Sequence, residues 1–188
     1  MTRKVAWVLS TLVFLALTAP GFVPGQDEKE LPAWEPAEEQ LEQLAGESKF
    51  DDWAVRPPLD FPHKIAKKPK ETITTWGKEA EGFVSVIQAN IAAGDDVTLE
   101  RAFDAYVATL KARFQNFKQN PSDYGRINGK KFIRVRFSAE GFPGISGRGY
   151  GFIYTTFDGK TPIAFAGYGT ATTIKTMEAS VLTFRILK

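Results

Sequence analysis

Arginine and lysine side chains are the residues of this sequence whose spacing points most directly to chemistry. Arg134 and Arg136 alternate with apolar residues, so both must point away from the buried side of a predicted strand. Three lysines of a proline-rich stretch and one further arginine could extend them into a basic patch, which would attract phosphate, acidic polymers or acidic proteins. The candidate partner-binding residues are Lys64, Lys67, Lys68, Arg134, Arg136 and Arg148. The alternative is an ordinary solvated strand face.

Catalytic chemistry is not predicted. His63 is the single histidine, and no nucleophile motif lies near it, so it is expected to be a surface loop residue rather than a catalytic base. The glycine-rich stretch 141–149 lacks the Gly-Lys-Ser/Thr ending of a phosphate-binding loop and is expected to connect two strands. No pair of residues predicts a Ser or Asp hydrolase. We therefore expect a protein that is not an enzyme.

Cofactors and nucleic acid are not expected either. The chain has no cysteine and one histidine, which excludes thiolate zinc sites, disulfides and multi-histidine metal sites within one chain. Alternating basic residues without exposed stacking aromatics do not predict nucleic-acid binding. Trp53 and Trp76 could line a ligand groove, although aromatic side chains more often fill cores.

The N-terminus resembles a secretory signal peptide. Arg3 and Lys4 precede an apolar run over 5–19, which is shorter than the roughly 20 residues a membrane-spanning helix needs. Prolines and glycines follow, and cleavage is expected near Gly25. We expect an exported protein, periplasmic or secreted, with no membrane span after signal removal; the alternative is an uncleaved anchor.

Charge divides the rest of the chain. The formal net charge is +2, but residues 26–52 hold ten acids and two lysines, whereas 53–188 hold twenty Lys and Arg and twelve acids. The acidic arm, 26–49, is either a solvated linker or a segment that screens the basic body until a partner displaces it. Within it, Pro36 and the leucine spacing predict a short helix over 36–45.

Periodicity predicts one principal helix and several strands. Steps of three and four predict a helix over 98–117 with Thr98 as its N-cap. Its apolar stripe is Leu99, Phe103, Tyr106, Leu110, Phe114 and Phe117, and its opposite face is Glu100, Arg101, Asp104, Lys111 and Arg113. Strands are expected over 50–56, 71–76 and 83–91, a basic loop over 57–70, and a closing helix over 176–182.

Two dipeptides predict hairpins. Asn128-Gly129 and Asp158-Gly159 are typical of two-residue turns, joining 124–127 to 130–138 and 148–157 to 160–171. The second turn would place Tyr154 opposite Ile163 and Phe152 opposite Phe165. One face of this hairpin is then aromatic, while the other carries small but still apolar residues that would let a helix approach closely. Both faces should be covered, which gives three layers.

The order of these elements resembles the PsbP-like α/β sandwich. The matching parts, within 50–188, are Trp53 with Pro57 and Pro58, the two strands, the helix after Val97-Thr98-Leu99, the Ile127-Asn128-Gly129 turn, and the end Thr183-Phe184-Arg185-Ile186. The resemblance implies an α+β fold of α/β/α type. Its mostly antiparallel sheet of about six strands would be covered by the long helix, 98–117, and shorter terminal helices.

The resemblance also bears on function. That superfamily includes the extrinsic PsbP subunit of photosystem II, a Ran-binding nuclear import factor and exported bacterial proteins, and its members mostly act as binding or accessory modules. The acidic arm and single histidine depart from photosynthetic PsbP, so no metal or photosystem role is carried over. We expect a domain at 50–188 that binds a protein or an anionic envelope component. The alternative is a carrier of an apolar small molecule between the long helix and the aromatic sheet face.

Overall fold

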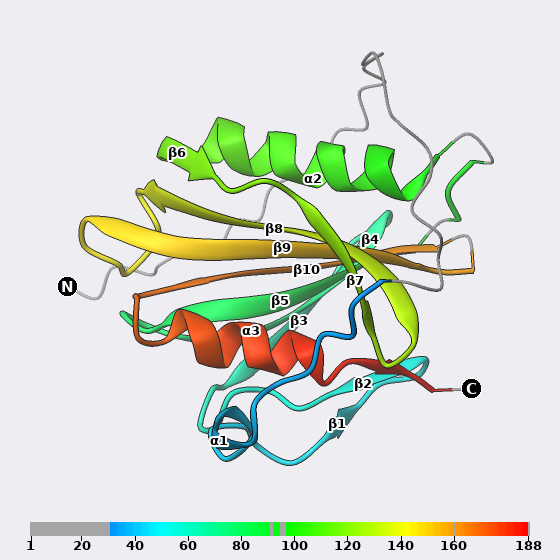
Figure 1. The fold of residues 1–188 in the computed structure, drawn as a ribbon, viewed down its shortest axis with the longest axis horizontal. Coiled ribbons are helices and arrows are strands. Elements are labelled where there is room, and N and C mark those ends of the chain that lie inside the picture. Colours follow the sequence, from blue (N-terminus) through cyan, green and yellow to red (C-terminus); the bar gives the residue numbers. More distant parts are fainter. Residues whose placement is uncertain (1–30, 91, 95–96, 160, 188) are drawn as a thin grey trace.

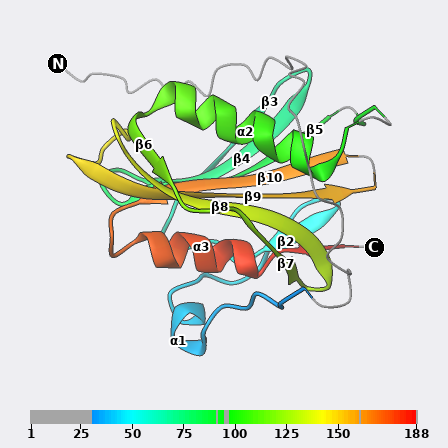
Figure 2. The same cartoon turned by 45° about the horizontal axis from the view of Figure 1, so that its top comes forward.

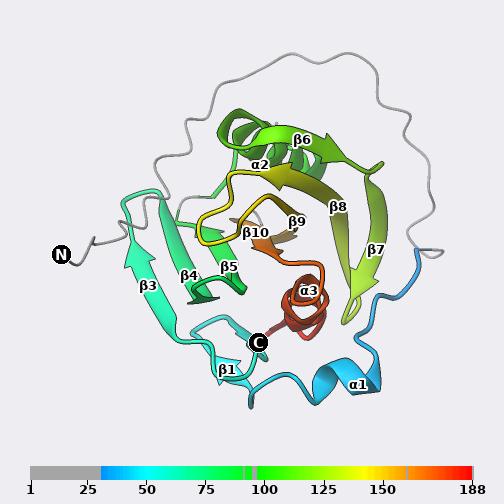
Figure 3. The same cartoon turned by 90° about the vertical axis from the view of Figure 1, so that its left-hand side faces the viewer.

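An antiparallel sheet forms the centre of the computed structural model, which describes residues 31–90, 92–94, 97–159 and 161–187. Its strands are β3 (His63–Lys67), β4 (Glu71–Lys78), β5 (Gly82–Ala89), β6 (Gln115–Gln119), β7 (Asp123–Ile127), β8 (Lys130–Glu140), β9 (Arg148–Asp158) and β10 (Thr161–Gly169). They run in the order β3-β4-β5-β10-β9-β8-β6, and β7 pairs with the first part of β8 (Figure 1). The sheet is strongly twisted (Figure 3).

Helices cover both faces of this sheet. They are α1 (Glu38–Leu41), α2 (Leu99–Arg113) and α3 (Ile174–Leu182), and a second, small sheet consists of β1 (Ser48–Lys49), β2 (Trp53–Val55) and β11 (Arg185–Ile186). The helix α2 lies on one face of the large sheet and α3 on the other (Figure 2). The expected α+β class with a mostly antiparallel sheet is confirmed. The expected six strands are too few, since the large sheet alone has eight among the described residues.

The helix α2 begins where the sequence predicts and ends earlier. The Thr98 hydroxyl caps it by accepting a hydrogen bond from the backbone N–H of Arg101 at 3.3 Å. The helix ends at Arg113, and the predicted continuation to Phe117 is wrong. Phe114 has left the helix (φ −108°), and Phe117 belongs to β6, where its ring stacks on Phe137 at 4.7 Å. Pairing with β8 and this aromatic contact outweigh the helical spacing.

The first predicted hairpin is confirmed and the second is displaced. Asn128 (φ 47°) and Gly129 (φ 79°) both have the positive φ of a type I′ turn. In the second hairpin Asp158 pairs with Thr161, so that Phe165 lies opposite Tyr154 instead of Phe152. The difference is two residues. Since side chains alternate with a period of two, every side chain keeps its predicted face and burial alone cannot distinguish the two registers.

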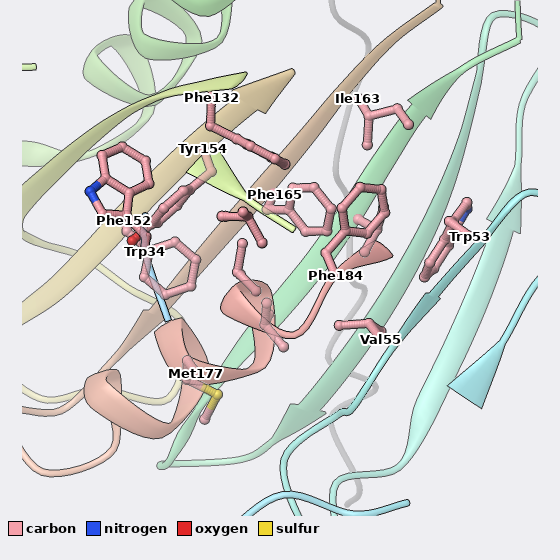
Figure 4. Close-up of a cluster of buried hydrophobic side chains, with 14 of the residues drawn as sticks. Trp34, Trp53, Val55, Phe132, Phe152, Tyr154, Ile163, Phe165, Met177 and Phe184 are labelled. Carbon is pink, nitrogen blue, oxygen red and sulfur yellow. The ribbon is translucent and has the colours of Figure 1, made fainter. Parts of the chain in front are cut away.

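The aromatic face of the sheet is closed by α3 and the small sheet. Met177 and Val181 of α3 and Phe184 beyond it are buried against it (Figure 4). Trp53 and Trp76 belong to the same cluster, with ring centroids 6.4 Å apart, so both are core residues rather than the walls of a groove.

Two further expectations change. The predicted basic loop 57–70 contains the strand β3, which pairs with β4. The arm packs on the body from residue 31 onward: Trp34 and Leu44 are buried, and the Arg56 side chain donates to the carbonyls of Leu41 and Leu44. This part of the arm is therefore not a solvated linker. The predicted signal peptide, 1–25, lies outside the described residues.

Candidate functional site: a cavity beside α2

Arg134 of the predicted basic patch is a structural residue. Its guanidinium donates to both carboxylate oxygens of Asp123 at 2.8 Å and to the Tyr154 hydroxyl at 3.1 Å. It also lies 3.9 Å from the ring centroid of Trp34, a cation–π geometry. The side chain is only 13% exposed. It points away from the α2 side of β8, as the alternation predicts, but the other side is covered as well.

The neighbouring cations are also paired. Arg136 donates to Glu178 of α3 at 2.8 Å, and the Tyr154 hydroxyl donates to the same carboxylate. Arg148 lies 3.8 Å from Glu140 across the β8–β9 pair. These arginines therefore hold β8, β9 and α3 together, and their charge is largely balanced within the fold.

The three lysines lie elsewhere. Lys64 and Lys67 are exposed on β3, on opposite faces of the sheet, and Lys68 pairs with Glu71 at 2.9 Å. Five strand spacings of about 4.8 Å separate β3 from β8, roughly 24 Å along the sheet. The six predicted residues thus do not form one continuous surface. Binding of a protein or an anionic envelope component by any of them stays a prediction.

The residues considered for catalysis do not converge. His63 is exposed at the start of β3, and the glycine-rich stretch contains the loop between β8 and β9. Among the described residues, no three His, Asp or Glu side chains gather in a way that could hold a metal ion. Within the same residues, no helix is both long and apolar enough to cross a membrane.

A cavity that could hold a ligand lies between α2 and the sheet, with a volume of about 380 Å³. The helix contributes Tyr106, Thr109, Leu110, Ala112 and Arg113; the sheet contributes Glu71, Ile73, Phe83, Ser85, Ile87, Phe152, Ile153, Ala166, Gly167 and Tyr168; the remaining lining residues are Phe114, Phe137 and Phe142. Thr109, Ala112 and Arg113 are exposed, so the cavity opens to solvent beside the second half of α2.

The cavity exists because α2 covers only part of its face of the sheet. The helix packs mainly on β8, β9 and β10, where Phe103 and Val107 are buried against Ile153. The adjoining strands β4 and β5 lie beside the helix rather than beneath it. Ala166, which faces α2, presents little side chain at this point, so the space between α2 and the sheet stays open.

Rings, not the helix, fill the region above two glycines of β9. A Cβ on Gly151 would lie 2.4 Å from the Phe137 ring, and a Cβ on Gly149 would lie 2.6 Å from Phe142. The small-residue face expected to admit a helix therefore admits these aromatic rings. Both rings also line the cavity.

Few polar groups line the cavity. Burial, helped by the nearby Glu71 carboxylate, raises the pKa of Tyr106 to about 12. Burial also raises the pKa of Tyr168, against the opposing charge of Arg113, and the Tyr168 hydroxyl donates to the carbonyl of Pro143 at 2.9 Å. Both phenols are therefore neutral donors near neutral pH. An apolar space with a few polar groups can hold an apolar ligand in a fixed orientation.

Comparison with known proteins bears on the fold. No protein-family model and no curated protein matches the chain. Among solved structures, cyanobacterial PsbP (CyanoP) from Synechocystis sp. PCC 6803 is similar over 72% of this chain and 86% of its own, with a TM-score of 0.52 and 12% identity. The chain has a PsbP-like fold. At this identity the likeness shows the fold alone. A protein of unknown function from Pseudomonas aeruginosa covers 72% of this chain and 89% of its own at 10% identity, but its TM-score of 0.41 supports no argument.

Within this PsbP-like fold, sequence reasoning placed an alternative ligand site between the long helix and the sheet, but it assigned the wrong face of the sheet and named none of the polar residues. It expected an apolar ligand on the aromatic face, whereas α2 lies on the face of small residues. It also assigned Arg113 to the solvent face of the helix. Arg113 follows Tyr106 by seven residues, which is nearly two complete turns, so both belong to one stripe. This seven-residue spacing is the feature of the sequence that could have placed Arg113 on the same side of the helix as Tyr106.

Proposed function

We propose that this protein binds an apolar small molecule in the cavity beside α2. The observation that supports the proposal is the volume of about 380 Å³. Protein interiors are close-packed and rarely keep voids larger than a water molecule. An engineered apolar cavity of about 150 Å³ already accommodates benzene, and ligand pockets commonly begin at about 300 Å³.

The composition of the walls supports the same proposal. Ile73, Ile87 and Leu110 offer aliphatic surface, and the aromatic lining residues offer ring faces and edges. Each methylene group of a ligand buried here gains about 0.8 kcal/mol. The site offers no set of acid, base and nucleophile, so the proposed role is binding or carrying rather than bond-making.

Filling the cavity tests the proposal. Ala166 lies on the cavity floor, so Ala166→Leu places an apolar side chain in the space that a ligand would occupy. The probe is the neutral, apolar dye N-phenylnaphthylamine, whose fluorescence rises in apolar surroundings. We expect the dye to bind the unaltered protein and to raise its thermal midpoint by mass action. In Ala166→Leu the dissociation constant should rise at least tenfold.

A matched substitution on the same helix provides the control. Ala108 of α2 is exposed and does not line the cavity, so Ala108→Leu adds the same side chain elsewhere. This variant should bind the dye like the unaltered protein. If the dye does not bind, or binds all three proteins equally, it does not use this cavity and the proposal is wrong.

A further inference from the structure

The two ends of the cavity differ in charge. At one end the carboxylate of Glu71 on β4 lies near the Tyr106 hydroxyl and accepts a hydrogen bond from Lys68 at 2.9 Å. At the other end Arg113 stands exposed at the cavity opening, next to Phe114. No carboxylate within the described part of the chain forms an ion pair with Arg113. Lys68 therefore balances the negative charge of Glu71, whereas the positive charge of Arg113 has no carboxylate partner among the described residues.

The dimensions favour a chain-like occupant. Phe83 and Ile87 mark the floor along β5, and four residues of a strand span about 13 Å. Tyr106 and Arg113 mark the roof along α2, and seven residues of a helix span about 10 Å. An extended alkyl chain with C–C bonds of about 1.5 Å advances roughly 1.3 Å per carbon, so about ten carbons match this length.

We infer that the ligand is a single-chain amphiphile, with its alkyl chain along the cavity floor and an anionic carboxylate or phosphate group at Arg113. This inference rests on the proposed function. Glu71 is already paired with Lys68, so that end of the cavity offers an anion no unbalanced positive charge, whereas the Arg113 guanidinium attracts one and favours this orientation. The C-terminal carbonyls of α2 carry only about half a negative charge, which leaves the guanidinium donors available to the ligand.

Four probes of equal chain length test the inference: decanoate, decyl phosphate, decanol and decylamine. Competition with N-phenylnaphthylamine gives each dissociation constant. A hydrogen bond to a charged group contributes enough to improve affinity about tenfold. We expect decanoate, decyl phosphate or both to bind about tenfold more tightly than decanol, and decylamine to bind no more tightly than decanol. The two anions separate a fatty-acid ligand from a phosphate-bearing lipid.

Substitution of the arginine assigns the effect. Arg113→Met should remove the preference for anions while leaving the affinity for decanol unchanged. Lys111→Met removes the same charge from an exposed position on α2 outside the cavity and should keep the preference. Circular dichroism of both variants checks that they fold.

The possible outcomes separate the two proposals. If all four probes bind the unaltered protein equally, or if Arg113→Met keeps the anion preference, the cavity still binds apolar molecules but the inference about the anionic group is wrong. If no probe binds, the proposed function fails together with the inference.

Discussion

Replacing Trp34 tests whether the arm ahead of the body is an integral part of the fold. Its side chain is 9% exposed and its ring meets that of Tyr154 edge-on, with centroids 5.6 Å apart. Gly125 lies directly beneath, because a Cβ there would come within 2.1 Å of the ring. The backbone N–H of Trp34 donates to the carbonyl of Arg126 at 2.7 Å, which fixes the segment beside β7.

The expected cost follows from this burial. Removing a buried Trp or Phe side chain costs about 3–5 kcal/mol, a range that includes the cavity left behind. The contact with Arg134 contributes about 1 kcal/mol of this. We therefore expect Trp34→Ala to lower the free energy of unfolding by about 4 kcal/mol. For a protein of this size that corresponds to a fall of about 10 °C in the thermal midpoint.

Urea unfolding followed by circular dichroism measures this difference. Leu59→Ala is the control, because Leu59 is 52% exposed and its loss should change stability by less than about 0.5 kcal/mol. Limited proteolysis provides a second readout, since Trp34→Ala should expose residues 31–49 to cleavage before the body unfolds. If Trp34→Ala is no less stable than Leu59→Ala, the arm does not contribute to the core and the reasoning is refuted.

Two further predictions concern the small-residue face of the sheet and the Tyr106 side chain of α2. Gly151→Ala places a methyl group 2.4 Å from the Phe137 ring and should lower unfolding free energy in urea by about 1–3 kcal/mol, whereas Gly46→Ala, which meets nothing within 4 Å, should not. Equal stability of the two variants would contradict the packing described. Since the pKa of Tyr106 is raised to about 12 from 10, folding favours its neutral form, and its contribution to stability should disappear as pH rises from 10 to 12. Ultraviolet titration should then show one late-ionising phenol fewer in Tyr106→Phe; an unchanged titration curve would contradict the assignment.

The sequence correctly predicted those features that depend on interactions between neighbouring residues. Thr98 caps α2, and the Asn128-Gly129 turn has the backbone that these residue types favour. Alternation along β9 and β10 gave the correct side chains to each face of the sheet. Each of these features is set by residues a few positions apart, so it can be predicted from the sequence alone.

Contacts between distant segments decided what the sequence could not. Phe114 and Phe117 continue the helical spacing, yet both pack against Phe137, and Phe117 lies in a strand paired with β8. Arg134 looks like a solvent-facing residue until Trp34, one hundred positions earlier, covers it. These contacts join residues that are far apart in the sequence, so no local pattern predicts them.

For this protein, then, the sequence alone determined the class of the fold, the two faces of its sheet and the order of elements that matches a PsbP-like fold. Tertiary structure decided where the arginines are paired and where a cavity stays open. The physical reason is that periodicity fixes which side of an element is buried. How deeply a side chain is buried, and where a cavity remains, depends on the position of α2 on the sheet and on contacts with side chains from distant segments.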